Sequence, residues 1–100
     1  MSVSVPGFYY NNTASAFTFS PVAITSGTIG IRYCFGNAVT RNSAVTIQMP
    51  ASTYLINAGA VASSAGTFVS AGALGDAACI VAVDTMHFQA YIGSGTWTNN

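Results

Sequence analysis

The sequence predicts an all-β protein, built as a small antiparallel β-sandwich or barrel of jelly-roll type. Three observations predict this class. Leu occurs only at Leu55 and Leu74 and neither Glu nor Lys occurs, so these three helix formers are nearly missing. Val, Ile, Thr, Tyr and Phe, which favour strands, are frequent. Several segments alternate apolar and polar residues with a period of two, and Gly, Ser, Asn and Ala separate them.

The N-terminal half contains the clearest alternation. Its Ile29, Ile31, Tyr33 and Phe35 share one face of an expected strand, which places Arg32 on the opposite face, toward solvent or a neighbouring subunit. The expected strands of this half lie at residues 3–5, 16–20, 28–35 and 44–49, and Pro50 ends the last one because it lacks a ladder donor.

The C-terminal half ends in an expected hairpin, 77–83 with 87–92, whose turn begins at Asp84. In its second strand, Phe88, Ala90 and Ile92 face one side, and His87, Gln89 and Tyr91 face the other. Two shorter strands are expected at 54–57 and 67–70. Residues 58–66 are expected as a loop, because no helical apolar stripe runs through them.

Charge is nearly absent, at 4% of residues, where a typical domain has about 25%. A chain of net charge zero without a basic cluster cannot neutralise phosphates, so nucleic acid and anionic membranes are not expected partners. The longest apolar runs, such as 77–83, are far shorter than the roughly 20 residues of a spanning helix. The N-terminus has no positive n-region and apolar h-region, so export by a signal peptide is not expected.

One domain is expected at residues 14–100, preceded by an N-terminal segment at 1–13. That segment alternates serine and valine before Pro6 and Gly7. Two interpretations are equally favoured. It is an arm that adds as a strand to another subunit, or it is the first strand of this domain.

The residues that carry chemistry are too few to predict an enzyme, a metal site or a cofactor. Asp84 and His87 are three residues apart across a turn, but no nucleophile accompanies them, and an Asp that stabilises its own turn explains the position more simply. Cys34 and Cys79 lack the spacing of a zinc site. We expect them to be free thiols, since no export signal is present, with a disulfide as the alternative.

Two further patterns favour structural interpretations. The sequon that begins at Asn11 is expected to be a chance match, because glycosylation requires a secretory compartment. Aromatic residues in polar surroundings, at Phe8, Tyr9, Tyr10 and Trp97, can stack on sugars, but packing within the domain or on a neighbour is the favoured explanation.

Three motifs from residue 31 onward resemble a known structural module. They are 31–35 (IRYCF), which is similar to a "G-x-R-Y-x-F" strand; 45–51 (VTIQMPA), which leads into a small-residue turn; and 75–84 (GDAACIVAVD) with 88–90 (FQA) and 95–98 (GTWT), which is similar to a closing hairpin. The module occurs in tailed-bacteriophage virion proteins, including tail fibres, head fibres and capsid decoration proteins. This chain departs from it at Phe88, where the family usually has Trp. The resemblance implies a fold and a virion context, but no catalytic residues.

Length favours one role within this family. A module of 100 residues fits a capsid decoration (cement) protein better than a long fibre. We therefore expect a homotrimer on the outer capsid surface, assembled in the host cytoplasm, that binds and stabilises the major capsid protein. A head- or tail-fibre module that binds a host receptor or glycan is the alternative. The candidate capsid contacts are Val3, Val5, Phe8, Tyr9 and Tyr10, and the candidate subunit interface is His87, Gln89 and Tyr91.

Overall fold

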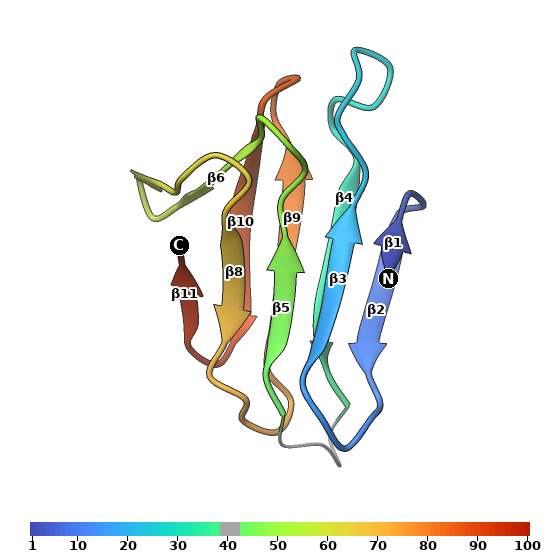
Figure 1. Ribbon diagram of the computed structural model, residues 1–100, viewed down its shortest axis with the longest axis vertical. Coiled ribbons are helices and arrows are strands. Elements are labelled where there is room, and N and C mark those ends of the chain that lie inside the picture. Colours follow the sequence, from blue (N-terminus) through green and yellow to red (C-terminus); the bar gives the residue numbers. More distant parts are fainter. Residues whose placement is uncertain (39–42) are drawn as a thin grey trace.

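The computed structural model describes residues 1–38 and 43–100 and confirms the all-β class, with strands and no helix in those residues. The strands form a five-stranded sheet in the order β1–β3–β5–β8–β11 and a six-stranded sheet in the order β2–β4–β9–β10–β6–β7 (Figure 1). In chain order they are β1 (Ser2–Val3), β2 (Gly7–Asn11), β3 (Phe17–Pro21), β4 (Arg32–Asn37), β5 (Val45–Gln48), β6 (Tyr54–Asn57), β7 (Ala60–Val61), β8 (Thr67–Ser70), β9 (Ala77–Ala82), β10 (His87–Ser94) and β11 (Trp97–Asn99).

Successive strands of the N-terminal half alternate between the two sheets. β1, β3 and β5 lie in one sheet and β2 and β4 in the other. Within each sheet, these strands run in the same direction and pair in parallel. β6 and β10 are also parallel. The C-terminal strands pair antiparallel, as β9 does with β4 and β10. The prediction of an antiparallel sandwich is therefore wrong in this respect, because the pairing is mixed.

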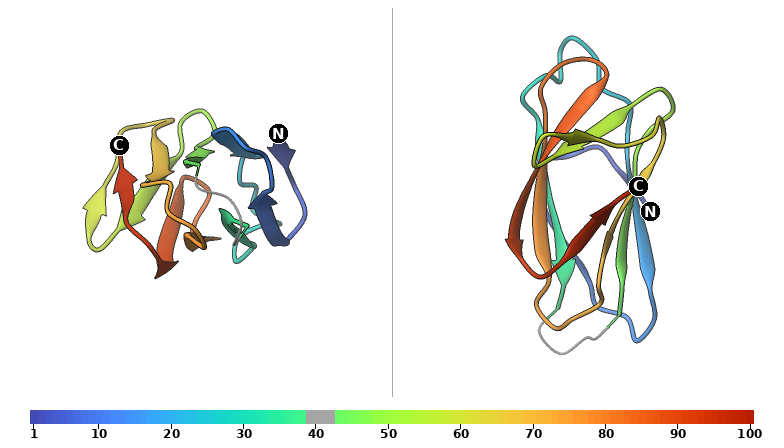
Figure 2. Two further views of the ribbon diagram at one scale, coloured as in Figure 1. Left: turned by 90° about the horizontal axis from the view of Figure 1, so that it is seen from below. Right: turned by 90° about the vertical axis from the view of Figure 1, so that its left-hand side faces the viewer.

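The two sheets face each other as separate layers (Figure 2). Within the described residues the barrel alternative is wrong, because each sheet keeps two edge strands: β1 and β11 in one, β2 and β7 in the other. Two of these edge strands, β1 and β7, have only two residues each. The homotrimer stays a prediction.

Aromatic rings from both sheets fill the space between the layers. Tyr9 of β2 lies against Phe19 of β3 and Phe35 of β4, with ring centroids 6.1 and 5.8 Å apart. At the other end, Phe68 of β8 stacks on Trp97 of β11 at 5.1 Å. Trp97 is therefore part of the packing, as expected. The side chains of Phe35, Val45, Ile47, Phe68, Ile80 and Phe88 are completely buried.

The strand expected at 28–35 begins later than its alternation indicates. β4 starts at Arg32, and Ile29 lies in a turn with 49% of its surface exposed. Gly30 has a φ of 94°, a conformation that ends an extended segment and that glycine adopts without steric cost. The faces are nevertheless as predicted, because Tyr33 and Phe35 are buried and Arg32 is exposed.

The C-terminal hairpin is confirmed. β9 and β10 pair antiparallel from Phe88 opposite Ala82 onward, and a register shift follows Ile92. Asp84 closes the turn by accepting a hydrogen bond from the backbone N–H of Met86 at 2.7 Å. Within the segment expected as a loop, the structure adds the two-residue strand β7, which pairs with β6.

Candidate functional site

The outer surface of the six-stranded sheet is the candidate functional site. Because side chains alternate across a strand, the residues between the buried ones point away from the second sheet. We call this surface the aromatic face. It consists of Phe8, Tyr10, Arg32, Cys34, Tyr54, Ile56, Cys79, Val81, His87, Gln89 and Tyr91.

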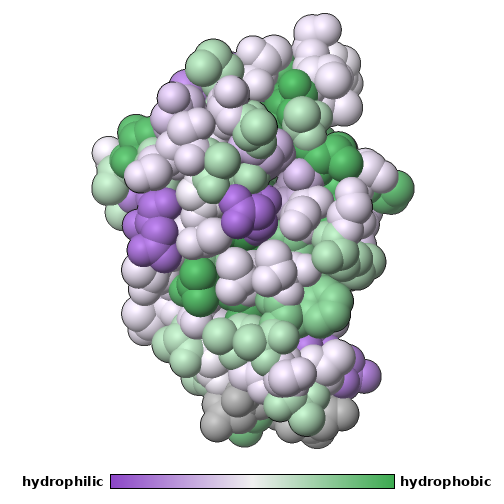
Figure 3. Space-filling view, viewed as in Figure 1, coloured by the Kyte–Doolittle hydropathy of each residue, from purple (hydrophilic) through white to green (hydrophobic). Residues whose placement is uncertain are grey.

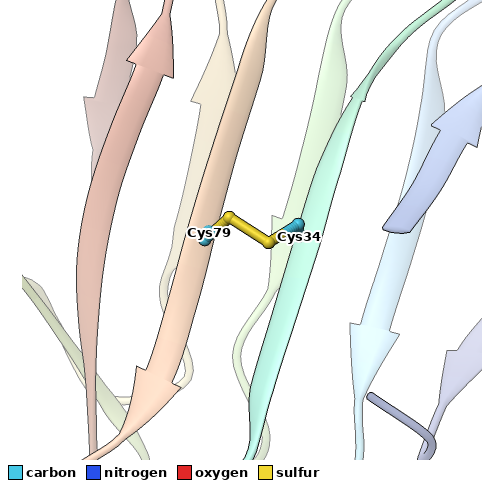
Figure 4. Close-up of a disulfide and its surroundings, with 2 residues drawn as sticks. All are labelled: Cys34 and Cys79. Atoms are coloured by element: carbon cyan, nitrogen blue, oxygen red, sulfur yellow. A yellow bond between two sulfur atoms is a disulfide. The ribbon is translucent and has the colours of Figure 1, made fainter. Parts of the chain in front are cut away.

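A disulfide lies in the middle of the aromatic face. Cys34 of β4 and Cys79 of β9 are direct partners in the antiparallel ladder, with Cα atoms 4.0 Å apart, and their sulfur atoms are bonded (Figure 4). Such a short Cα separation belongs to the closely spaced type of ladder pair. The expectation of two free thiols is therefore wrong. A spacing of 45 residues does not disclose that two strands adjoin.

Aromatic side chains flank the disulfide on both sides. Phe8 of β2 is paired in register with Cys34, and Tyr91 of β10 is paired with Cys79, so the four residues form one row across the sheet. Phe8 and Tyr91 expose 63% and 59% of their surfaces. Phe8 also stacks on Tyr10, with centroids 5.9 Å apart and rings nearly parallel, which restrains both side chains.

The five candidate capsid contacts separate into exposed and buried residues. Phe8 and Tyr10 lie on the aromatic face, and Val5 is exposed in the segment between β1 and β2. Val3 is buried in β1, and Tyr9 points between the sheets onto Phe35. Residues 1–13 thus contribute one edge strand to each sheet, which corresponds to the strand interpretation of this segment.

The three candidate subunit contacts share the aromatic face with Phe8 and Tyr10. Tyr91 is exposed, while His87 and Gln89 are half-buried. The His87 ring stacks on Tyr54 at 5.5 Å, and its Nδ1 lies 2.9 Å from Asp84 Oδ1. The structure therefore brings together residues that are about 80 positions apart in the sequence, although their contact with another subunit stays a prediction.

The two side-chain carboxylates of the chain, Asp76 and Asp84, are both held by hydrogen bonds within the chain. The Met86 N–H, and then the His87 ring, hold the pKa of the Asp84 carboxyl below its ordinary value. Asp76 is buried, and its Oδ2 accepts hydrogen bonds from the N–H groups of Gly72 and Ala73 at 3.1 and 3.0 Å. Each carboxylate thus accepts backbone hydrogen bonds from the turn to which it belongs.

An open depression of about 610 Å³ lies at the Arg32 end of the aromatic face. Strands β2, β4 and β9 contribute its walls, together with the turn that precedes β4. The lining residues are Pro6, Gly7, Phe8, Gly30, Ile31, Arg32, Cys34 and Val81. An exposed aromatic ring and a guanidinium thus border one hollow. Strand alternation predicted the outward direction of Arg32, but the hollow depends on the pairing of β2 with β4.

The outer surface of the other sheet has a different character. One row across β3, β5, β8 and β11 consists of Thr18, Thr46, Val69 and Thr98, which are paired in register. Figure 3 shows this surface, and most of it lies near the middle of the hydropathy scale. Threonine hydroxyl groups therefore make up most of this row on the five-stranded sheet, while aromatic rings and the disulfide form the corresponding row on the six-stranded sheet.

No family model, curated protein or solved structure matches this chain. The likeness to phage virion modules therefore remains a prediction from the motifs quoted above. Among the described residues, no group of three His, Cys, Asp or Glu side chains is placed to hold a metal ion, and no helix is long and apolar enough to cross a membrane.

Proposed function

We propose that this protein is a non-enzymatic binding protein of the virion that decorates a capsid and stabilises it through the aromatic face. The observation that carries the binding role is the composition of this face. Protein interfaces are enriched in Phe, Tyr and Arg and depleted of Lys, Glu and Asp, and the aromatic face includes residues of the first group and none of the second. Phe8, Tyr10 and Tyr91 are all more than half exposed.

Burial of this surface supplies enough free energy for stable attachment. A standard interface covers about 800 Å² on each partner, about one sixth of the 4865 Å² that this chain exposes. At ~25 cal/mol/Å² such an area contributes a gross gain of order ten kcal/mol, before the entropy lost on association. Few charges must be desolvated in the process, because the chain has so few.

The virion assignment draws on the motif resemblance and on the disulfide. Disulfides persist in oxidising surroundings and are rare in the cytosol. A bond between Cys34 and Cys79 is compatible with a protein that works on the outside of a particle after release from the cell, even when the particle assembles in the cytoplasm. The capsid and the sister subunits of a homotrimer are the proposed partners.

Disassembly of purified particles tests this proposal. We expect the chain to co-purify with the major capsid protein in hundreds of copies, and particles that lack it to release their contents at lower temperature. A few copies that co-purify with tail components would contradict the decoration role and favour the fibre alternative. Binding of the free protein to host cells or glycans, with unchanged capsid stability, would lead to the same conclusion.

A further inference from the structure

Among the described residues, 1–38 and 43–100, Arg32 is the one arginine on the aromatic face, and no carboxylate of these residues lies at salt-bridge distance from it. The chain contains two acidic side chains, Asp76 and Asp84. Asp76 is buried and binds the backbone of residues 72 and 73, and Asp84 contacts His87. Within the same described residues, this contact of His87 with Asp84 is the only one at salt-bridge distance.

A guanidinium in this position restricts which surfaces can cover the face. Arginine stays charged at every physiological pH. A partner that covers Phe8 and Tyr91 also removes water from Arg32, and an unpaired buried charge is strongly destabilising. An apolar or neutral partner surface would therefore bind poorly here, whereas a carboxylate restores two parallel hydrogen bonds to the guanidinium.

We propose that the depression beside Phe8 receives an Asp or Glu side chain of the capsid protein, which pairs with Arg32 when the aromatic face docks. This inference rests on the proposed function, because it identifies the partner chemistry at the same surface. The hollow has room for a carboxylate side chain with its neighbouring atoms, at about 610 Å³. Apolar side chains such as Phe8 and Val81 line it, so the pair forms away from bulk water, where charge pairs are stronger.

The depression is also held in shape before a partner arrives. The disulfide joins β4 to β9 at its floor, and Phe8 is restrained by its stack on Tyr10. Preformed sites lose less conformational entropy on binding. A second copy of this chain is a poorer source of the carboxylate, because its Asp76 is buried and its Asp84 already binds His87 and Met86.

The absence of lysine from this chain permits a direct test. In the Arg32→Lys variant, position 32 carries the only side-chain amine, which a zero-length carbodiimide reagent joins to a carboxylate in contact with it. We expect particles decorated with this variant to yield a cross-linked peptide between residue 32 and an Asp or Glu of the major capsid protein. Thr98→Lys is the control, with the same added amine on the outer surface of the five-stranded sheet, and we expect no such peptide from it.

Affinity measurements complete the test on particles stripped of this protein. We expect Arg32→Gln to weaken rebinding at least tenfold and Thr98→Gln, on the outer surface of the five-stranded sheet, to weaken it less than threefold. If the wild type rebinds and Arg32→Gln rebinds with the same affinity, the inference is overturned and the decoration role stays intact. Failure of the wild type to rebind would overturn both. Two other results would also overturn the inference. One is a cross-link from residue 32 only to Asp84 of a sister copy. The other is that the free wild-type protein binds glucuronate, the free Arg32→Gln protein does not, and no cross-link to the capsid protein forms.

Discussion

Gly95 packs its Cα directly against the carboxylate of Asp76. The contact joins the turn after β10 to the turn before β9, and a Cβ at position 95 would overlap Asp76 Oδ1. Gly95 also has a φ of 85°, which other residues rarely adopt. The closing motif that contains GDAAC and GTWT is thus held together by a glycine and a buried acid that touch in space.

Substitution of Gly95 by Ala is expected to lower the free energy of unfolding by about 2–4 kcal/mol, because it adds steric overlap to backbone strain. Gly59→Ala is the matched control, since Gly59 has a similar φ of 82° but nothing within 4 Å of an added Cβ. That variant is expected to lose about 1 kcal/mol. Urea denaturation measures both, and equal losses would contradict the role of the Asp76 contact.

The disulfide is expected to contribute about 4 kcal/mol to stability by the chain-entropy relation, since it closes a loop of 45 residues. The double variant Cys34→Ser/Cys79→Ser should therefore unfold at lower urea concentration. Denaturation of the wild type with and without a reducing agent measures the same contribution without a substitution. A midpoint that does not change on reduction would show that the bond adds no stability.

Alkaline pH is expected to destabilise the fold through Tyr33. Burial, and then the neighbouring Tyr9, raise the pKa of the Tyr33 hydroxyl above its ordinary value of 10.0. The unfolded chain therefore loses this proton first, so the stability present below pH 10 falls as the pH rises toward the folded-state pKa. Tyr33→Phe should show a smaller fall between pH 9 and 11 in urea denaturation. An identical pH dependence in both proteins would refute this assignment.

Asn11 is expected to be structural and unavailable for glycosylation. It is 1% exposed, its Nδ2 donates to Ser15 O at 3.0 Å, and its Oδ1 accepts from the N–H and hydroxyl of Thr13. Asn11→Ala should reduce the free energy of unfolding by about 1–3 kcal/mol, because it leaves these partners unpaired. Exposed Asn12→Ala serves as the control, with a change below about 0.5 kcal/mol. Comparable losses in thermal denaturation would argue against this role.

Alternation along single strands was the most informative signal in the sequence. It predicted the C-terminal hairpin and the opposite faces of Phe88 and Tyr91, because one face of each strand is buried. It did not distinguish parallel from antiparallel pairing, since both give a period of two. The winding of β1 to β5 between two sheets was therefore not predictable from these patterns.

The candidate site was predictable only in pieces. Phe8 and Tyr10 were predicted as capsid contacts, Tyr91 as a subunit contact, and Arg32 was expected to face solvent or a neighbouring subunit. Their assembly on one surface depends on β2 lying beside β4 and β4 beside β9, which are contacts between distant parts of the chain. The same long-range pairing creates the disulfide, so it was missed for the same physical reason.

The alternation of β1 to β5 between layers has a consequence for the order of folding. No two consecutive strands of β1 to β5 are paired, so this half cannot fold through successive hairpins. Its strand pairs join distant parts of the chain, and each pair must first overcome the entropy cost of loop closure. The β9–β10 hairpin has no such barrier, and it is synthesised after β1 to β8. We therefore expect residues 1–75 on a stalled ribosome to remain protease-sensitive and dependent on chaperones, because β4, β6 and β8 still lack their partners β9, β10 and β11, and the chain has few charges that would keep its apolar strands apart.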